Sequence, residues 1–164
     1  MFGFLSTLAT AEYGYFGGYL LVNGLGRPLE FHCTEPLRPN RAQQILFGAT
    51  LPSYLYGEQI GQSLVNHSPL KPALLITDQR PVLAVRMLVE IPTVWLPAPS
   101  DFEPAMPEGY LPLQLPSHTV WLAEAQAADR ELILQSSGRA LPGWDLGEPF
   151  QRIQEAISEL HKAA

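Results

Sequence analysis

The fold class is decided by the stretch Tyr19-Leu20-Leu21-Val22-Asn23-Gly24-Leu25-Gly26, which the alternating segment Leu29-Glu30-Phe31-His32-Cys33-Thr34 follows. The apolar run predicts a buried strand over residues 15–22, and the alternation predicts a second strand over 28–34. The Asn- and Gly-rich residues between them tolerate the positive φ angles that tight hairpins require. A helical pattern begins at Asn40, a plausible N-cap. The stretch therefore predicts a hairpin that leads into a helix.

The remaining elements follow from shorter patterns. Gly48 and Pro52 divide the predicted helix over residues 40–66 into two pieces. The spacing of Phe2, Leu5 and Leu8 predicts a short N-terminal helix. Further strands are predicted over 73–77, 82–89 and 91–95, then a hairpin of 119–125 with 131–135, and the last helix begins near Glu148.

These elements indicate one α+β domain over residues 1–164. Its predicted core is an antiparallel sheet of five or six strands, with a helix after the first hairpin and a C-terminal helix. The segment from Pro97 to Pro116 contains six prolines, counting both ends. Because proline lacks the donor that a sheet ladder needs, residues 97–116 are predicted to form an arm or a long loop.

This order of elements resembles that of roadblock and longin domains, which also place a helix after the first hairpin and another at the end. The resemblance covers most of the chain except the proline arm. Small acidic secretion chaperones have a comparable mixture of strands and helices. Modules of this kind pair with themselves or with other proteins, so the resemblance implies a role in protein interaction.

Composition narrows the possible partners and compartments. The net charge is −6 and only two of the ten basic residues are Lys, so the chain lacks the basic stripe of nucleic-acid-binding proteins. A single cysteine excludes an internal disulfide and a multi-thiolate metal site. No stretch approaches a membrane span, and the N-terminus lacks the charge of a signal peptide. We therefore expect a cytoplasmic protein with no membrane and no nucleic-acid partner.

Two groups of residues invite a catalytic interpretation. His32 and Cys33 are adjacent in a strand, so their side chains should diverge, and Cys33 should share a buried face with Leu29 and Phe31. Glu30 and His32 share the other face. If Asp78 and Glu90 converge on them, the four residues would form a metal site for a hydrolase or nuclease, although no metal-binding motif supports it.

Aromatic residues gather around the proline arm, namely Trp95, Phe102, Tyr110 and Trp121. Large rigid side chains beside a proline-rich segment suit an interface anchor, and they equally suit packing on their own domain. The sequence favours a non-catalytic protein-interaction or scaffold module, without cofactor or bound metal. Its expected partner is another protein or a second copy in a homodimer, bound through the sheet edge or through Trp95 and the arm. The alternatives are the metal-dependent enzyme and a small-ligand binder with its pocket between helix 40–66 and the sheet.

Overall fold

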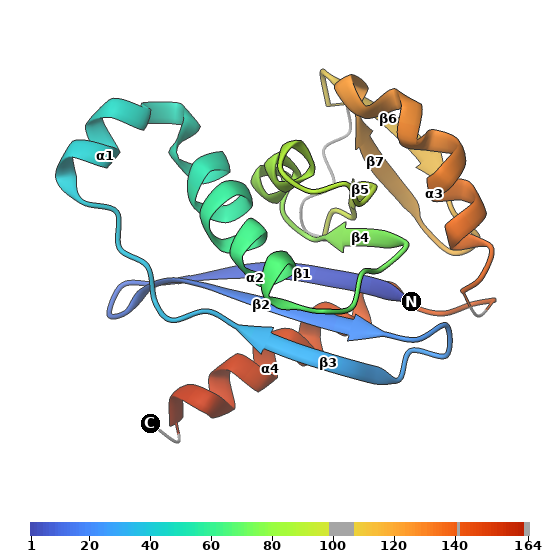
Figure 1. The fold of residues 1–164 in the computed structure, drawn as a ribbon, viewed down its shortest axis with the longest axis horizontal. Helices are drawn as coiled ribbons and strands as arrows, with labels where there is room; N and C mark the ends of the chain where they lie inside the picture. The colour runs from blue at the N-terminus through green and yellow to red at the C-terminus, as the bar shows by residue number, and fades with distance from the viewer. Residues whose placement is uncertain (99–106, 141, 163–164) are drawn as a thin grey trace.

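The computed structural model describes residues 1–98, 107–140 and 142–162. A seven-stranded open sheet forms its centre, in the order β3-β2-β1-β4-β5-β7-β6 (Figure 1). The strands are β1 (Phe2–Thr10), β2 (Gly14–Val22), β3 (Pro28–Cys33), β4 (Leu74–Thr77), β5 (Thr93–Trp95), β6 (Tyr110–Gln114) and β7 (Thr119–Ala123). Strand β1 pairs in parallel with β4, and β4 with β5, whereas the other neighbours are antiparallel. The α+β class is confirmed, but the sheet is mixed rather than antiparallel and has seven strands.

Helical segments cover both faces of this sheet. They are α1 (Arg41–Phe47), η1 (Gly48–Thr50), η2 (Ser53–Gly61), α2 (Gln62–His67), η3 (Arg80–Met87), η5 (Glu124–Asp129), α3 (Arg130–Ser137) and α4 (Glu148–Lys162). One buried cluster joins the sheet to η2, α2 and η3, and another joins it to α3 and α4. Alternate strand residues supply the two clusters: Leu20 and Val22 face α4, whereas Tyr19 and Leu21 face η2. The sheet is thus the middle of three layers.

Strand β1 replaces the predicted N-terminal helix. Its first six residues are all buried, because the strand lies between β2 and β4 with helices on both faces. A strand buried on both faces has a continuous apolar run rather than an alternation. The spacing of Phe2, Leu5 and Leu8 was therefore not a helical signal.

Two predicted strands are helices. Residues 82–89 lie mainly in η3, where Val82 and Val85 pack on the sheet at helical spacing. Pro81, at the start of η3, suits a helix N-terminus. Residues 131–135 lie in α3. Both segments contain apolar residues that occur in strands and in helices, so their short patterns did not distinguish the two.

The predicted proline arm is regular at its end. Residues 110–114 form edge strand β6 even though Pro112 lies in its middle. An edge strand tolerates proline, because its outer side has no partner that needs a donor. The replacement of two predicted strands by helices and the gain of β1 change the element order on which the resemblance to roadblock and longin domains rested.

Other local predictions are confirmed. The Asn40 side chain accepts a hydrogen bond from Gln43 N at 2.8 Å, and Gln43 Oε1 accepts one from Asn40 N at 3.0 Å, which is a complete capping box. In the turn before β3, Gly26 has a φ angle of 73°. The last helix α4 begins at Glu148 and buries Ile153 and Ile157 against the sheet.

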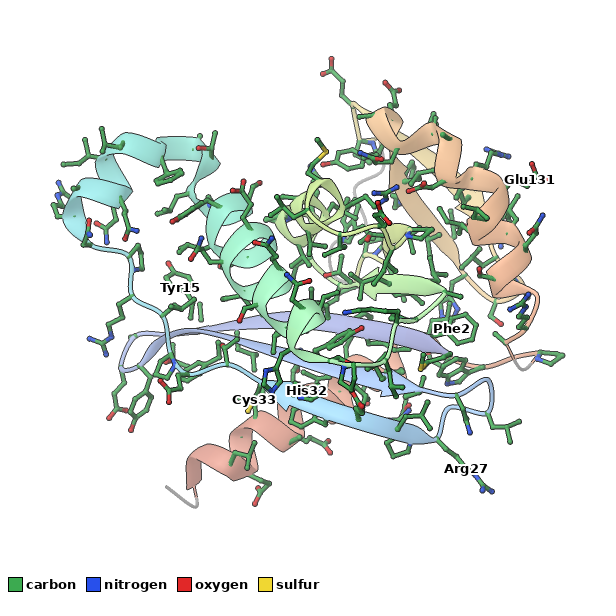
Figure 2. The ribbon with its side chains drawn as sticks, in the orientation of Figure 1. Phe2, Tyr15, Arg27, His32, Cys33 and Glu131 are labelled. Carbon is green, nitrogen blue, oxygen red and sulfur yellow. The ribbon has the colours of Figure 1, made fainter. Side chains whose placement is uncertain are left out.

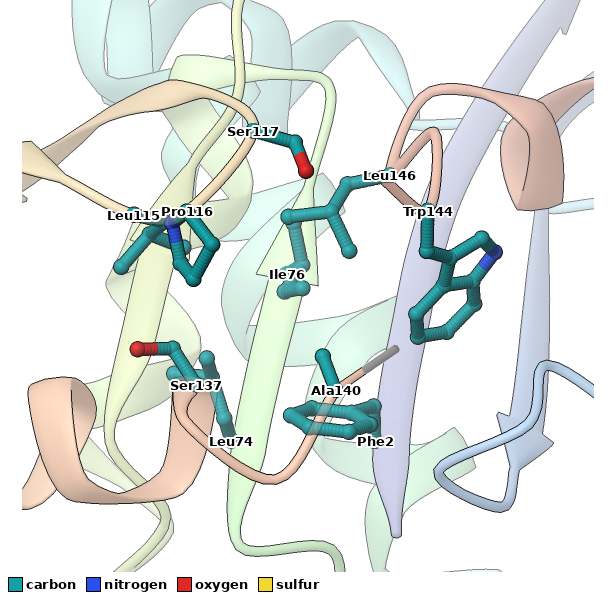
Figure 3. Close-up of a pocket in the computed structure, with 10 residues that line it drawn as sticks. All are labelled: Phe2, Leu74, Ile76, Leu115, Pro116, Ser117, Ser137, Ala140, Trp144 and Leu146. Carbon is teal, nitrogen blue, oxygen red and sulfur yellow. The ribbon is translucent and has the colours of Figure 1, made fainter. Parts of the chain in front are cut away.

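A small gap in the α4-side core is closed by the segment before α4 (Figure 3). Trp144 contacts the rings of Phe2 and Phe4 edge-on, with centroids 5.8 and 5.7 Å away. The gap measures about 10 Å³, which is room for roughly one water molecule. It is a packing defect of the core and too small for a ligand.

Candidate functional site

The four residues of the predicted metal site do not come together. Glu30 and His32 are neighbours on β3, with His32 Nε2 3.0 Å from Glu30 Oε2. Asp78 follows β4, which is separated from β3 by both β2 and β1, and it accepts a hydrogen bond from Ser6. Glu90 follows η3 and lines a surface hollow with Lys71. Within the ranges that the structure describes, no group of three or more His, Cys, Asp and Glu side chains could hold a metal ion.

Glu30 instead holds β3 to the end of α2. Ser68 is buried, and its hydroxyl donates a 2.6 Å hydrogen bond to the same Glu30 oxygen that faces His32. The Ser68 hydrogen bond, followed by that of His32, lowers the pKa of Glu30, since both stabilise its charged form. In the Ser-His-Asp arrangement the imidazole is the immediate base of the serine. Here the carboxylate lies between serine and imidazole, so the cluster is a structural tie.

The prediction for the other face of β3 was partly wrong. Phe31 packs against the α4-side core, but Leu29 is 47% exposed and Cys33 is also exposed. β3 is at one edge of the sheet, so its side chains have a neighbouring strand on one side only. An exposed row on an edge strand is a surface available for contact.

A groove borders β3 on the side of α2, where the small-ligand alternative placed its pocket. It measures about 430 Å³ and is lined by His32, Cys33, Thr34, Glu35, Leu37, Gln59, Ser63, Leu64 and His67. The rings of His32 and His67 meet edge-on, with their centroids 5.3 Å apart. His32 and Cys33, labelled in Figure 2 on β3, both line this groove, and the imidazole of His32 bonds to Glu30.

A second hollow, of about 270 Å³, lies where β4 and β5 end. Its polar lining includes Asp78, His118 and Asp145, and His118 Nε2 is 3.2 Å from Asp145 Oδ1. Ligands of open α/β sheets commonly bind beyond the carboxyl ends of parallel strands. The Asp145 side chain is 68% exposed, so this hollow is a wide surface depression.

Most of the predicted aromatic contact set packs within the domain. Trp95 is 6% exposed, and its Nε1 donates to the Asp78 carbonyl at 3.3 Å. The Arg80 guanidinium lies 4.7 Å above the Trp95 ring and 5.5 Å from that of Tyr110. Trp121 is directly opposite Trp95 in the β5–β7 pair. Burial leaves Trp95 little surface to offer a partner, and Phe102 lies outside the described residues.

The large apolar side chain with the highest exposed fraction among the described residues, Leu46, lies in a segment that the sequence analysis did not single out. We name residues 36–52 the α1 extension, because Figure 1 shows α1 standing away from the sheet at the far end of the helical segment that leads to α2. Helix α1 contains no buried residue, and Ile45 and Leu46 are 64% and 82% exposed. The sequence signal was present in Ile45-Leu46-Phe47. Three consecutive apolar residues point in three directions around a helix and cannot all face one neighbour.

The base of the extension is firmly attached to the domain. Tyr15 and Leu37 exchange two backbone hydrogen bonds, of 2.9 and 2.8 Å, and Figure 2 shows Tyr15 beneath the extension. The ring of Phe47 stacks on Tyr54, with centroids 4.0 Å apart. These contacts and the capping box hold α1 in one orientation and leave Ile45 and Leu46 exposed.

Comparisons with known proteins add no family to this description. No protein-family model, no curated protein and no solved structure matches the chain. No helix among the described residues is long and apolar enough to cross a membrane.

Proposed function

We propose that this protein is a non-catalytic protein-interaction module that contacts its partner through the α1 extension. One observation carries the proposal: α1 is a capped and anchored helix whose Ile45 and Leu46 side chains are largely exposed in the described domain. Contiguous exposed apolar surface on a soluble domain commonly marks an interaction site.

The energetics of α1 support a docking role. An isolated helix of seven residues is marginal in water, so its capping box and its anchored base are needed to keep it formed. Burying a leucine or isoleucine side chain in a partner contributes about 1.5–3 kcal/mol. Because α1 is already held in place, little of that gain is lost to ordering it.

Charge indicates the kind of partner. Residues 36–57 contain Arg38 and Arg41 and no acidic residue, so they carry +2, and the rest of the chain carries −6 − 2 = −8. A basic, apolar helix suits an apolar groove with an acidic rim. Docking of α1 onto the acidic body of a second copy would be a head-to-tail contact, which extends into open filaments unless its rotation closes a ring. We therefore assign α1 to a different protein.

The test begins with a photo-crosslinking amino acid at position 46 in the native host. A protein captured there is then purified, and its binding to the wild-type chain is measured by calorimetry. We expect Leu46→Ala to weaken binding about 10- to 100-fold, which corresponds to about 1.4–2.8 kcal/mol. Leu132→Ala is the matched control, since Leu132 is a 54% exposed leucine on α3.

Two results would contradict the proposal. One is a captured protein that binds the wild type and the Leu46→Ala variant equally well. The other is crosslinking at position 46 to lipid or to a second copy alone.

The groove beside α2 favours a second candidate function, the binding of a small ligand. Its volume of about 430 Å³ lies within the range of ligand pockets. A ligand that binds there stabilises the native state, so it should raise the melting temperature of the wild type. The shift should disappear in Ser63→Trp, which fills the groove, and a shift that persists in that variant rules this site out.

A further inference from the structure

A single residue turns the backbone where α1 ends. Gly48 has a φ angle of 49° and a ψ angle of −123°. Phe47 before it, and Leu51 and Pro52 after it, have right-handed helical angles. Figure 1 shows that α1 is turned away from the helical segment that leads to α2. We name residues 47–54 the Gly48 corner.

The backbone angles of Gly48 suit glycine and no residue that carries a Cβ atom. A positive φ with a ψ near −120° lies outside the allowed regions of such residues, and it is the mirror image of an extended conformation. A Cβ atom added at Gly48 would have no other atom within 4 Å. The glycine is therefore required by the backbone angles alone, and not by a lack of space.

Pro52 explains why the helix bends here. Within a helix, the ring of a proline clashes with the carbonyl group four residues before it, and the proline has no N–H to donate to that group. The carbonyl group four residues before Pro52 belongs to Gly48. At the corner this carbonyl accepts a hydrogen bond from Leu51 N instead. The proline thus opposes a straight helix, and the glycine provides the angles that the bend needs.

Contacts across the corner hold α1 at its C-terminal end. Gly48 N donates to the carbonyl of Gln44, and the Thr50 hydroxyl donates to the carbonyl of Phe47 at 2.7 Å. The stack of Phe47 on Tyr54 joins the last residue of α1 to the beginning of η2. The capping box and the attached base hold the other end of α1, so both ends of the helix are fixed.

We propose that Gly48 is the positioning residue of the docking helix, because it sets the direction in which α1 presents Ile45 and Leu46 to a partner. Leu46 lies two residues before Gly48, so a change in the angles of Gly48 redirects or unfolds the turn that carries it. A helix already held in its bound direction needs little further ordering on binding. The inference rests on the proposed function and deepens it, since it names the residue that controls this same site.

The effect of a substitution at Gly48 should be confined to the α1 extension. A side chain at this position strains the backbone, and the strain is relieved when the turn opens. Helix α1 contributes no buried residue, so it can open locally while the core remains folded. We expect Gly48→Ala to loosen α1 and to leave the melting temperature of the domain within about 2 °C of the wild type.

Hydrogen exchange followed by NMR on the full chain tests this expectation without a partner. The amides of α1 should exchange about 10- to 100-fold faster in Gly48→Ala than in the wild type. A D-alanine at position 48, introduced by peptide ligation, favours the mirror-image angles and should keep the slow exchange. The matched control is Gly143→Ala, because Gly143 also has a positive φ angle, of 76°, and free space around its Cβ position. This control should leave exchange in α1 unchanged.

Three exchange results would overturn the inference. The first is a wild type whose α1 amides exchange as fast as those of an unfolded peptide. The second is unchanged exchange in Gly48→Ala. The third is equal exchange in the proteins with L-alanine and D-alanine at position 48, because an effect of the backbone angles must depend on chirality.

Binding separates the inference from the proposed function. Gly48→Ala should weaken the binding of a protein captured at position 46 by about 10-fold or more, with D-alanine at position 48 restoring it. Faster exchange in α1 with unchanged binding overturns the positioning role. The proposed function is tested instead by Leu46→Ala, which removes the docking side chain and keeps the Gly48 corner.

Discussion

A single added methyl group at Gly17 should expose how tightly η2 lies on the sheet. Gly17 is in β2, and a Cβ atom there would lie 2.0 Å from Ile60 Cγ2 and 2.8 Å from Leu64 Cδ1. Ordinary carbon contacts are about 3.5–4.0 Å. The substitution Gly17→Ala therefore requires η2 or the strand to move by about 1.5 Å.

The cost of this movement can be bounded from two opposing terms. Overpacking of a dense core costs about 1–3 kcal/mol. Replacing glycine by alanine in a strand returns about 0.5–1 kcal/mol, because alanine loses less conformational freedom on folding. We expect Gly17→Ala to lower the free energy of unfolding by about 1–2 kcal/mol, which in a chain of this size lowers the melting temperature by about 2–8 °C.

Urea unfolding and calorimetry of the wild type and its variants measure this effect. The control Gly138→Ala should lie within about 0.5 kcal/mol of the wild type, since its nearest neighbours would be 3.6 and 3.8 Å from the new Cβ. Ile60→Leu removes the branched methyl that Gly17→Ala strikes. In that background the cost of Gly17→Ala should fall by about 0.5 kcal/mol or more. A Gly17→Ala protein as stable as the wild type would refute the close approach of η2 to β2.

Three further predictions concern charge and burial. Arg86 in η3 bonds the largely buried carboxylate of Asp129 in η5 at 2.7 Å, so Arg86→Ala should lower the free energy of unfolding by about 3 kcal/mol in urea. The control Arg152→Ala breaks a more exposed pair within α4 and should lower it by at most about 1 kcal/mol; equal losses would refute this reasoning. The hydrogen bonds to Glu30 lower its pKa, so its ionised form stabilises the fold above the ordinary carboxyl pKa, and this contribution is lost as the pH falls through the lowered value. Ser68→Ala should raise the pKa of Glu30 in an NMR titration, and an unchanged pKa would show that Ser68 is not the main cause of the lowering. Among the described residues the buried Tyr19 hydroxyl has no hydrogen-bond partner, so Tyr19→Phe should raise the free energy of unfolding by about 1 kcal/mol, whereas a loss would indicate a bound water.

Local patterns predicted the parts of this fold that neighbouring residues determine. The β2–β3 hairpin, the Asn40 cap and helix α4 depend on turn residues and amphipathic spacing, which are visible in a single sequence. The parallel pairing of β1 with β4 joins segments that lie far apart in the chain, and no local signal carries that information. β1 was assigned wrongly because burial on both faces removes the alternation that distinguishes a strand from a helix. η3 was assigned wrongly because its short apolar segment also fits the alternation of a strand.

The candidate sites show the same division between local and distant information. Strand alternation placed Glu30 and His32 on one face, and the structure confirms their contact. It could not place Asp78 or Glu90, whose positions depend on the order of strands in the sheet. The exposure of Cys33 likewise follows from the edge position of β3, which only the assembled sheet defines.

The α1 extension is separate from the apolar core of the domain. The core is complete without it, since α1 contributes no buried side chain. A contact made by one short helix is small, and its affinity alone would be modest. Substitution of Leu46 should therefore change binding with little effect on folding.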